Sequence, residues 1–422
     1  MTPFAVVHLS HSNSGGASTA SQRLHTLLEY HSVRSLLVYK WKTTSSAIGV
    51  QLSHRCPLPF LSKLIEKVFR IPFKLLRPIQ YHSLSCFTDI QLKQLTQLGD
   101  VLHLHWPHGS TLSIEDYRKI DLPLVITMHD CWYFCGAEHH FDLASAFSPF
   151  NDYKSSISQL NIRQFLLALI NAHTYRRKKH SWKNLNATFV APSRWIFELA
   201  KQSPLLSCKK IIYCPNPIPP HYFNLKPRDQ RVRSLFTNPH LPILLAPISD
   251  LNDKNRPYQK ALQTLLQTVA QSASLKFNLL IITKRTLTLP LAPCIDVHQT
   301  NLHKFDDKLY NILSSCDLLF YPSLSDNLPQ LCIESTTQGL PIVAFNTGGV
   351  PETIPPCQHS NLVPTGHIPQ LTAKTISLLS SPNVLKAQSD VALSHFDYDY
   401  NLAIRDTMIN CYADAIADHI TP

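Results

Sequence analysis

Glycine is scarce in this chain, with only 10 glycines among 422 residues, well below the usual ~7%. None occurs between Gly136 and Gly339. Because glycine alone permits positive φ angles and close backbone approach at no steric cost, a chain that avoids it keeps it where nothing else fits. The adjacent pairs Gly15-Gly16 and Gly348-Gly349 are therefore candidate ligand contacts, although a plain turn is the commoner explanation of an isolated pair.

Charged side chains are also few, at 16% of the sequence against 44% hydrophobic ones, which excludes a disordered chain. No apolar run approaches the ~18–20 residues that a membrane-spanning helix needs. The first residues, MTPFAVVHLSH, lack a basic n-region and a small-residue cleavage site. We therefore expect no secretory signal and a cytoplasmic protein.

The 11 cysteines show no C-x-x-C spacing, which argues against a structural zinc site and favours reduced thiols. Cys131, Cys135 and the pair His139-His140 lie close together in sequence. No fourth ligand follows them at zinc-finger spacing, and the H-E-x-x-H pattern of zinc enzymes is absent. We expect no metal and no other cofactor.

The balance of 39 basic against 28 acidic residues gives a net charge of +11, which favours anionic partners. Such partners include nucleic acid, anionic lipid and phosphorylated substrates. No aromatic-interleaved basic strand and no recognition-helix pattern supports nucleic-acid binding, so we expect none.

Short apolar runs rich in Val, Ile and Leu alternate with helical patterns, in two series of roughly 200 residues each, the size of one large domain. The predicted strands are 4–9, 35–39, 101–105, 122–128, 188–191 and 211–213, then 242–246, 277–283, 317–321 and 341–345. The predicted helices include 17–30, 258–271, 304–315, 330–338, 371–379 and 400–419. This alternation predicts two doubly wound α/β domains.

The proline-rich segment 214–220 is unsuited to a helix or a central strand and predicts a stiff linker. We therefore expect domains at 1–217 and 218–395, followed by a helical segment at 396–422. In open parallel sheets, ligands bind outside the carboxyl ends of the strands, so the loops there should line a cleft.

Four segments at such strand ends carry candidate chemistry. Ser12–Ser18 opens a helix with Gly15 and Gly16, where backbone N–H groups bind anions; a plain strand-to-helix turn explains it equally well. His129, at the end of the 122–128 strand, suits a sugar hydroxyl or acid–base chemistry, although a hydrogen-bonded turn histidine is the commoner case. Lys254 and Arg256 suit a diphosphate; an exposed charged loop is the simpler explanation.

The most informative segment runs from Tyr321 to Gly339. Asp326 precedes a predicted helix and Glu334 lies inside it, eight residues later. Helix N–H groups suit a diphosphate, and the two carboxylates suit sugar hydroxyls. A helix cap formed by Asp326 would account for that residue alone, but not for Glu334 or for the second glycine pair.

Residues 59–81 carry five basic side chains and one acidic one among many apolar residues. Such a segment either lies on an anionic membrane surface or packs as an ordinary amphipathic helix. The run Arg176-Arg177-Lys178-Lys179 would add to membrane attraction.

Together these motifs resemble the family-4 retaining glycosyltransferases of the GT-B fold, and most closely the colanic-acid type that builds exopolysaccharide and lipopolysaccharide. The likeness rests on the glycine pair Gly15-Gly16 and on the runs Asp100–Trp106, Thr127–Trp132 and Val190–Trp195. It also rests on Asp326 to Glu334, where residues 322–329 match the family's P-S-x-x-E-N-L-P except for Asp326 at the glutamate position. It implies two Rossmann-like domains, with acceptor binding by the N-terminal one, nucleotide-sugar binding by the C-terminal one, and a last helix that packs back toward the first.

The resemblance also implies residue roles. His129 and Asp326 would act at the transferred sugar as the catalytic residues. The donor-binding residues would be Gly15, Gly16, Lys254, Arg256, Asn327, Leu328 and Glu334. The partners would be a nucleotide-sugar donor and a glycan or lipid-linked acceptor, without a metal, and the location would be cytoplasmic or peripheral on the inner face of the plasma membrane.

The sequence departs from the family where Asp326 replaces a glutamate and Arg256-Pro257 replaces Lys-Gly. Three other interpretations therefore stay open. They are a sugar-nucleotide epimerase of the same fold, which needs no acceptor, an inactive relative of the enzymes, and a phosphorylase, for which no pyridoxal-binding segment is found.

Overall fold

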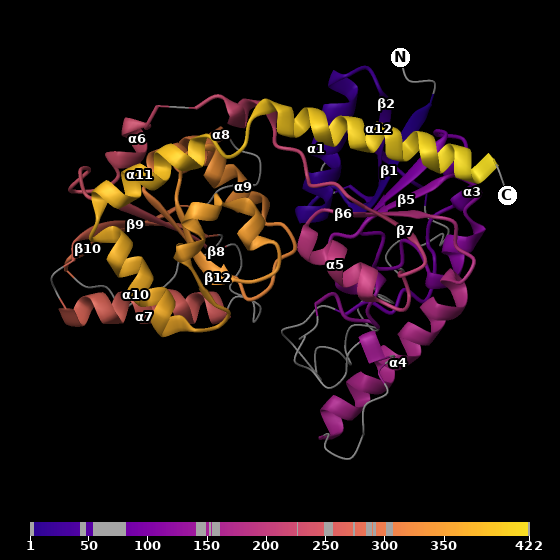
Figure 1. Cartoon of the computed structure of the whole chain (residues 1–422), viewed down its shortest axis with the longest axis horizontal. Coiled ribbons are helices and arrows are strands. Elements are labelled where there is room, and N and C mark those ends of the chain that lie inside the picture. Colours follow the sequence, from indigo (N-terminus) through magenta and orange to yellow (C-terminus); the bar gives the residue numbers. More distant parts are fainter. Residues whose placement is uncertain are drawn as a thin grey trace. The chain divides into compact units, whose positions relative to one another are not determined.

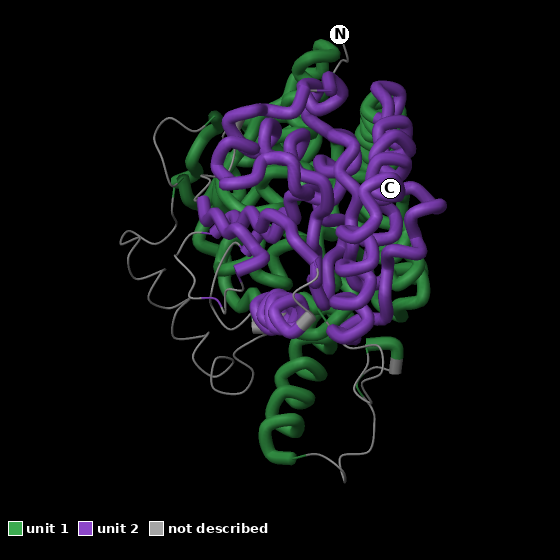
Figure 2. Tube along the Cα trace, turned by 90° about the vertical axis from the view of Figure 1, so that its left-hand side faces the viewer, with its two compact units in different colours: residues 1–217, 401–422 green, residues 218–400 purple. Residues whose placement is uncertain are grey.

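The computed structural model describes residues 4–42, 48–53, 82–140, 149–151, 153, 161–225, 227–248, 256–272, 275–283, 289, 293–300 and 307–420. Helices and strands alternate along the chain (Figure 1). The chain divides into two compact units (Figure 2): unit 1 comprises residues 1–217 and 401–422, and unit 2 comprises residues 218–400.

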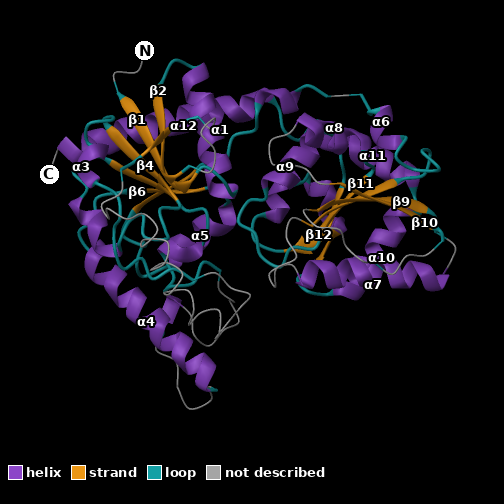
Figure 3. Cartoon of the chain, turned by 180° about the vertical axis from the view of Figure 1, so that it is seen from behind, coloured by secondary structure: helices purple, strands orange, loops and turns teal. Residues whose placement is uncertain are grey.

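Unit 1 contains a seven-stranded sheet in the order β3-β2-β1-β4-β5-β6-β7 (Figure 3), and its neighbouring strands pair in parallel. Its strands are β1 (Ala5–Ser12), β2 (Arg34–Trp41), β3 (Val50–Gln51), β4 (Val101–His105), β5 (Leu124–Thr127), β6 (Thr188–Ala191) and β7 (Lys210–Tyr213). Its helices are α1 (Gly16–Tyr30), α3 (Leu92–Leu95), α4 (Ile162–Trp182), α5 (Arg194–Gln202) and most of α12 (Tyr398–Ile420).

The two faces of this sheet differ in character. Leu9, Leu104 and Ile126 pack on one face in an apolar cluster that also contains the buried Trp132. The opposite face, which α1 and α12 cover, carries polar side chains: the His103 ring lies against Tyr412 of α12, and their side chains form a 2.8 Å hydrogen bond. Parallel strands buried on both faces normally carry apolar side chains throughout, so this polar face is unusual.

Unit 2 contains a six-stranded parallel sheet in the order β10-β9-β8-β11-β12-β13. Its strands are β8 (Ile243–Ile248), β9 (Phe277–Thr283), β10 (Ile295–Thr300), β11 (Leu318–Tyr321), β12 (Ile342–Asn346) and β13 (Leu362–Pro364). Its helices are α6 (Gln230–Arg233), α7 (Arg256–Ser272), α8 (Asp307–Ser315), α9 (Gln330–Thr337), α10 (Ile368–Leu379) and α11 (Pro382–Leu393).

Strand β8 shows why this sheet sits at the centre of unit 2. Leu244 and Ala246 belong to one apolar cluster, and Ile243 and Leu245 belong to another. Because successive side chains of a strand point to opposite faces, both faces of the sheet are buried.

Helix α9 ends in a way that glycine makes possible. Gly339 has a φ of 69°, Gly339 N donates to Thr336 O at 3.0 Å, and Leu340 N donates to Ser335 O at 2.9 Å. This pair of bonds is the Schellman motif, which satisfies the last carbonyl groups of a helix. The chain turns sharply there and enters β12.

The structure confirms the predicted fold class, two doubly wound α/β units. Strands 101–105, 188–191 and 277–283 have the predicted bounds. The sequence-based assignment missed β3, β10 and β13 and the helices α3, α4, α5, α6 and α11. Within the described residues, no helix combines the length and apolar character needed to cross a membrane.

Each sheet has one point where the strand order reverses, between β1 and β4 in unit 1 and between β8 and β11 in unit 2. Ligands of open parallel sheets bind at the carboxyl ends of the strands beside such a point. The loops that follow β1, β4, β8 and β11 are therefore the places to search for a site.

Candidate functional site

The loop between β1 and α1 leaves open space around its glycine pair. Gly15 has a φ of 100° and a ψ of 167°, a conformation that is essentially restricted to glycine. A Cβ built on Gly15 or Gly16 would meet nothing within 4 Å. The first turn of α1 contains no acidic side chain. The loop thus offers a helix N-terminus and free volume to an anionic ligand.

The loop after β4 is held by a buried lysine from β2. Lys40 is fully buried, its Nζ lies 3.1 Å from Gly109 O and 3.6 Å from Asp89 Oδ2, and it also bonds Ser110 Oγ. Gly109 has a φ of 59°, and a Cβ there would lie 2.9 Å from the His11 ring. These contacts fix the turn that follows His105.

Asp130 anchors the loop after β5. It accepts hydrogen bonds from Trp132 N at 3.0 Å, Trp106 Nε1 at 2.7 Å and His139 Nδ1 at 2.6 Å. Burial alone would raise the pKa of this carboxyl group, but His139 and the other partners outweigh burial and hold it below its usual range. Asp130 is therefore ionised and positions the loops through Trp106, Trp132 and His139.

His129 lies at the carboxyl end of β5, partly exposed. Its Nε2 lies 3.0 Å from Nδ1 of the buried His105, and the two rings are 5.3 Å apart. Burial lowers the pKa of His129 to about 4, against the opposing effect of Asp130. His129 is therefore an uncharged imidazole near pH 7.

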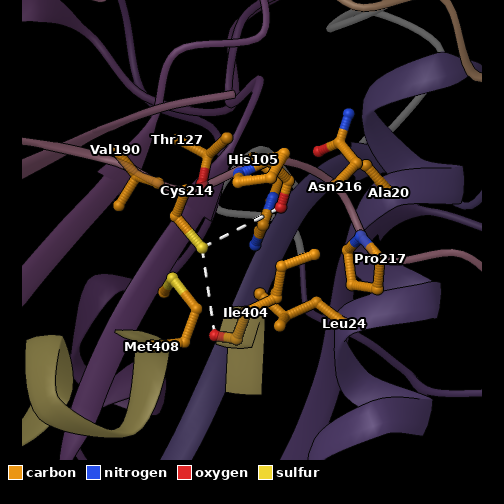
Figure 4. Close-up of a pocket in the computed structure, with 11 residues that line it drawn as sticks. Ala20, Leu24, His105, Thr127, Val190, Cys214, Asn216, Pro217, Ile404 and Met408 are labelled. Carbon is orange, nitrogen blue, oxygen red and sulfur yellow. Dashed lines mark hydrogen bonds between the residues drawn. The ribbon is translucent and has the colours of Figure 1, made fainter. Parts of the chain in front are cut away.

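A small pocket opens on the α1 and α12 side of the unit 1 sheet (Figure 4). His105 and Thr127 line it from the sheet, and the side chains of α1 and α12 close it. Cys214, whose Sγ lies 3.9 Å from Ile404 O, and Asn216 complete the wall. His105, although only 1% exposed, thus borders a small cavity on this face of the sheet.

In unit 2, Asp326 lies in the loop after β11 and is partly exposed. Tyr321 OH donates to Asp326 Oδ2 at 2.7 Å. Burial raises the pKa of the Asp326 carboxyl group, although the Tyr321 hydroxyl and the Asn327 N–H oppose that rise. Asp326 does not cap α9, because Pro329 holds the N-cap position. The helix-cap explanation of Asp326 is therefore wrong.

The second glycine pair belongs to the same site as Asp326. Gly349 N donates to Asp326 O at 3.1 Å, and Thr347 Oγ1 donates to Leu324 O at 2.9 Å. Gly348 has a φ of 54°, and a Cβ there would lie 1.7 Å from Asp326 O. Only glycine fits at this position, so the loops after β11 and β12 are joined through it.

The remaining donor-site candidates lie along the same loop and helix. Asn327, Leu328 and Glu334 are 6%, 7% and 4% exposed, respectively, with Glu334 in the middle of α9. Lys254 lies outside the described residues. Arg256 begins α7, but its side chain also lies outside them. The structure thus brings together Asp326, Asn327, Leu328 and Glu334 in unit 2, and the Gly15-Gly16 pair and His129 at the carboxyl edge of unit 1.

Two groups of side chains in unit 1 have ligand atoms within 4.8 Å of one another, close enough to hold a metal ion. One contains His8, His103 and His105, and the other contains His108, Asp130 and His139. Hydrogen bonds within the protein already engage both nitrogens of His103, His105 and His139. By contrast, both nitrogens of the buried His108 and Nε2 of His8 have no hydrogen-bond partner among the described residues.

The predicted basic surface cluster at 176–179 is wrong for two of its four residues. Lys178 is fully buried and donates to Gly136 O at 2.7 Å and Cys135 O at 3.0 Å, with its Nζ 3.4 Å from the centre of the Trp132 ring. Arg177 is half-buried and pairs with Glu115 at 2.8 Å. The earlier segment 59–81 lies outside the described residues.

Sequence reasoning missed two residues of the site, Tyr321 as the partner of Asp326 and His8 as the partner of His105. The histidines at positions 8, 103 and 105, all within predicted strands, were a signal for the second. Tyr321 gave no separate signal, because a tyrosine at the end of a buried strand is ordinary.

Residues 253–381, which lie wholly within unit 2, match the family model described as glycosyl transferases group 1. The chain is also 31% identical over 96 residues to the MMP alpha-(1->4)-mannosyltransferase of Mycolicibacterium hassiacum. That alignment covers 22% of this chain and 23% of the relative. The matched part therefore spans less than a quarter of the mannosyltransferase.

Solved structures resemble the chain over nearly its whole length. A glycosyltransferase from Rickettsia africae has a TM-score of 0.60 at 14% identity, covering 99% of both chains. Anabaena HepE, solved in complex with UDP-glucose, has a TM-score of 0.57 at 15% identity, covering 96% of this chain and 99% of that one. At these identities the likeness shows the fold alone, and the fold is that of the GT-B glycosyltransferases.

Proposed function

We propose that this protein is a glycosyltransferase that moves a sugar from a nucleotide-sugar donor to a glycan or lipid-linked acceptor. The observation that carries the proposal is the joined pair of loops in unit 2, where Gly349 N and the glycine-only position Gly348 meet Asp326. These loops follow β11, at the reversal of strand order, and β12 beside it, where parallel sheets bind ligands. The match to group 1 glycosyl transferases covers the same part of the chain.

The chemistry of unit 2 suits a nucleotide-sugar. Asp326 offers a carboxylate oxygen to sugar hydroxyls while Tyr321 holds its other oxygen. Glu334, one turn into α9, would accept the ribose hydroxyls once the loop admits a ligand. By the family resemblance, Lys254 and Arg256 would neutralise the diphosphate, so we propose that the reaction needs no metal.

For unit 1, the family resemblance leads us to propose that Gly15 and Gly16 bind a diphosphate and that His129 contacts a transferred sugar. The HepE complex contains UDP-glucose, which supports a sugar nucleotide as the donor class here. The resemblance to family-4 retaining enzymes leads us to propose retention of the anomeric configuration. The same resemblance is the ground for proposing a role in cell-surface polysaccharide synthesis.

The test is sugar transfer by the full-length protein with a panel of UDP-, GDP-, ADP- and CMP-sugars, in EDTA, with glycan and lipid-linked acceptors. We expect one nucleotide class to give an acceptor-dependent product with the anomeric configuration of the donor, as read by NMR. An epimer formed from the donor without acceptor would instead identify an epimerase. Absence of turnover together with donor binding would identify an inactive relative.

We also propose that unit 1 contacts an anionic membrane surface through α4. Ile162, Leu166 and Leu169 are 70%, 40% and 50% exposed. They lie on one face of α4, and the exposed Arg176 continues that face toward the end of the helix. An apolar stripe followed by positive charge suits the interface of an anionic bilayer.

Flotation with phosphatidylglycerol vesicles tests this membrane proposal. We expect the wild type to float with the vesicles and a Leu166→Asp, Leu169→Asp variant to float much less, since a buried charge opposes insertion. A variant at the exposed Lys201 of α5, Lys201→Gln, is the control for a general loss of positive charge. Equal flotation of all three proteins would exclude α4 as the contact.

A further inference from the structure

Three histidines form a hydrogen-bonded row across the buried polar face of the unit 1 sheet. In the register of the parallel strands, His8 of β1 lies opposite His103 of β4, and His105 of β4 lies opposite Thr127 of β5. Because paired residues share a face, His8, His103 and His105 project to the same side, and His129 follows two residues after Thr127. His8 and His105 are 0% and 1% exposed, respectively.

The row runs from inside the unit to its edge. His8 Nδ1 lies 3.1 Å from His105 Nε2, and His105 Nδ1 lies 3.0 Å from His129 Nε2. His103 stands beside the row and outside it. Its ring is 4.0 Å from that of His105, and Tyr412 OH and Thr127 Oγ1 engage its two nitrogens.

Burial keeps every imidazole of the row neutral. It lowers the pKa of His8 to about 3, that of His105 well below its usual value, and that of His129 to about 4. A neutral imidazole carries one N–H donor and one bare acceptor nitrogen. In a row of three, the hydrogens must therefore all point in the same direction, either toward His8 or toward His129.

The inner end of the row decides between these directions. His8 Nε2 is buried and has no hydrogen-bond partner among the residues that the structure describes. If the hydrogens pointed toward His8, this atom would carry a buried N–H with no acceptor, which native proteins rarely tolerate. If they point toward His129, the atom keeps only a lone pair, which costs less.

We propose that His8 and His105 are positioning residues that fix His129 as the tautomer with its hydrogen on Nδ1, which then donates to an oxygen of the bound nucleotide-sugar. His8 Nδ1–H donates to His105 Nε2, and His105 Nδ1–H donates to His129 Nε2. His105 engages Nε2 of His129, whose side chain is partly exposed. The nature of the ligand rests on the proposed function, whereas the tautomer does not.

This assignment limits the chemistry of His129. Its Nδ1 already carries a hydrogen and its Nε2 accepts one from His105, so neither nitrogen is available to take a proton from an acceptor hydroxyl. His129 therefore recognises an oxygen that accepts a hydrogen bond, such as a sugar hydroxyl or a phosphate oxygen, and is no general base.

The test reads the tautomer directly by long-range ¹H–¹⁵N NMR of the full-length protein labelled with ¹⁵N-histidine, because protonated and bare ring nitrogens have well-separated ¹⁵N shifts. His129→Gln identifies the His129 signals by their disappearance. We expect His129 with its hydrogen on Nδ1 alone, from pH 6 to pH 8. Finding the hydrogen on Nε2, or a mixture of both tautomers, would overturn the proposal.

A matched pair of variants separates positioning from mere packing. His8→Asn keeps an N–H donor near the place of Nδ1, and His8→Leu removes it. We expect His8→Asn to keep the His129 tautomer and donor affinity of the wild type. We expect His8→Leu to give mixed tautomers and about threefold to tenfold weaker donor binding, the range for the loss of one neutral hydrogen bond.

Circular dichroism checks that both variants fold, and His105→Leu, which cuts the row next to His129, is the alternative if His8→Leu does not. An unchanged tautomer in the folded variant that lacks the donor would contradict the proposal. If the wild type binds no nucleotide-sugar, the proposed function fails, and the tautomer still decides whether the row acts as described.

Discussion

At the scale of single residues, the unit 2 site depends on a contact that only glycine allows. Gly348 passes so close to Asp326 that a Cβ would lie 1.7 Å from its carbonyl oxygen. Asp326 in turn receives the Tyr321 hydroxyl at 2.7 Å. The backbone of one loop and the side chain of a strand residue therefore fix the position of one carboxylate.

Gly348→Ala should destabilise unit 2 by about 3 kcal/mol or more, because backbone must move to relieve the overlap. Gly16→Ala is the matched control, since a Cβ there meets nothing within 4 Å. We expect Gly16→Ala to leave unfolding within about 0.5 kcal/mol of the wild type and to weaken donor binding, if a ligand approaches that backbone. Urea unfolding and donor titration measure the two effects, and equal stability of the two variants would contradict this description.

Tyr321→Phe should weaken donor binding severalfold while costing about 1 kcal/mol of stability, the net value of one hydrogen bond. The variant frees Asp326 Oδ2 from its partner and raises the pKa of the carboxyl group further. Asp326→Asn should remove donor binding altogether if the carboxylate contacts the sugar. Calorimetric titration of both variants measures this, and wild-type affinity in Asp326→Asn would exclude the proposed contact.

The residue types of this site could be predicted from the sequence, but their contacts could not. The spacing of Asp326 and Glu334 and the pair Gly348-Gly349 pointed to the region where the loops after β11 and β12 meet. Tyr321 donates a hydrogen bond to Asp326, and Asp130 accepts hydrogen bonds from Trp106 and His139. These contacts depend on the paths of the loops, which no local sequence pattern encodes. Whether His129 and Glu334 act as proposed stays a prediction.

At the scale of elements, strands were predicted well where nearly all of their side chains are buried, as in β4, β6 and β9. Strand β10, with the sequence IDVHQT, was missed because all but one of its side chains are partly exposed, so its composition is mixed. Helix α4 was missed because its buried side includes Asn171, Thr174 and Lys178. A buried lysine interrupts the apolar periodicity by which a helix is recognised in a sequence.

Lys178→Met should destabilise unit 1 by about 2 kcal/mol, because it leaves buried carbonyl groups of the loop after β5 without their donor. Arg176→Met on the same helix is the control, since Arg176 is exposed and should change stability by less than about 0.5 kcal/mol. Denaturant unfolding followed by tryptophan fluorescence reports on Trp132, which lies under Lys178. A similar midpoint for both variants would show that the hydrogen bonds from Lys178 to the loop carbonyl groups contribute nothing to stability.

At the scale of the whole molecule, the buried histidines make stability depend on pH. Burial lowers the pKa values of His8, His103, His105 and His129 in the folded chain, whereas an unfolded histidine titrates near 6.5. Between the folded and unfolded values, the unfolded chain binds more protons. Stability is therefore complete above about pH 6.5 and is lost as the pH falls below it.

Unfolding measured from pH 7.5 to pH 5 should show a falling midpoint, with up to ~1.4 kcal/mol per pH unit from each buried histidine. His8→Asn should reduce the number of protons taken up on unfolding by about one, and so reduce this slope. His173→Asn, at an exposed position of α4, should not change the slope. A midpoint that stays flat across this range would mean that these histidines are protonated inside the fold, contrary to their burial.

The central claim, that unit 2 binds a nucleotide-sugar, is tested most directly by thermal unfolding with UDP-, GDP-, ADP- and CMP-sugars in EDTA. A ligand at a hundred times its dissociation constant adds ~2.7 kcal/mol, which corresponds to a rise of roughly 5–10 °C for a unit of this size. We expect such a rise with one nucleotide class for the wild type and none for Glu334→Ala. No rise with any of the donors, in a wild type that unfolds cooperatively, would contradict it.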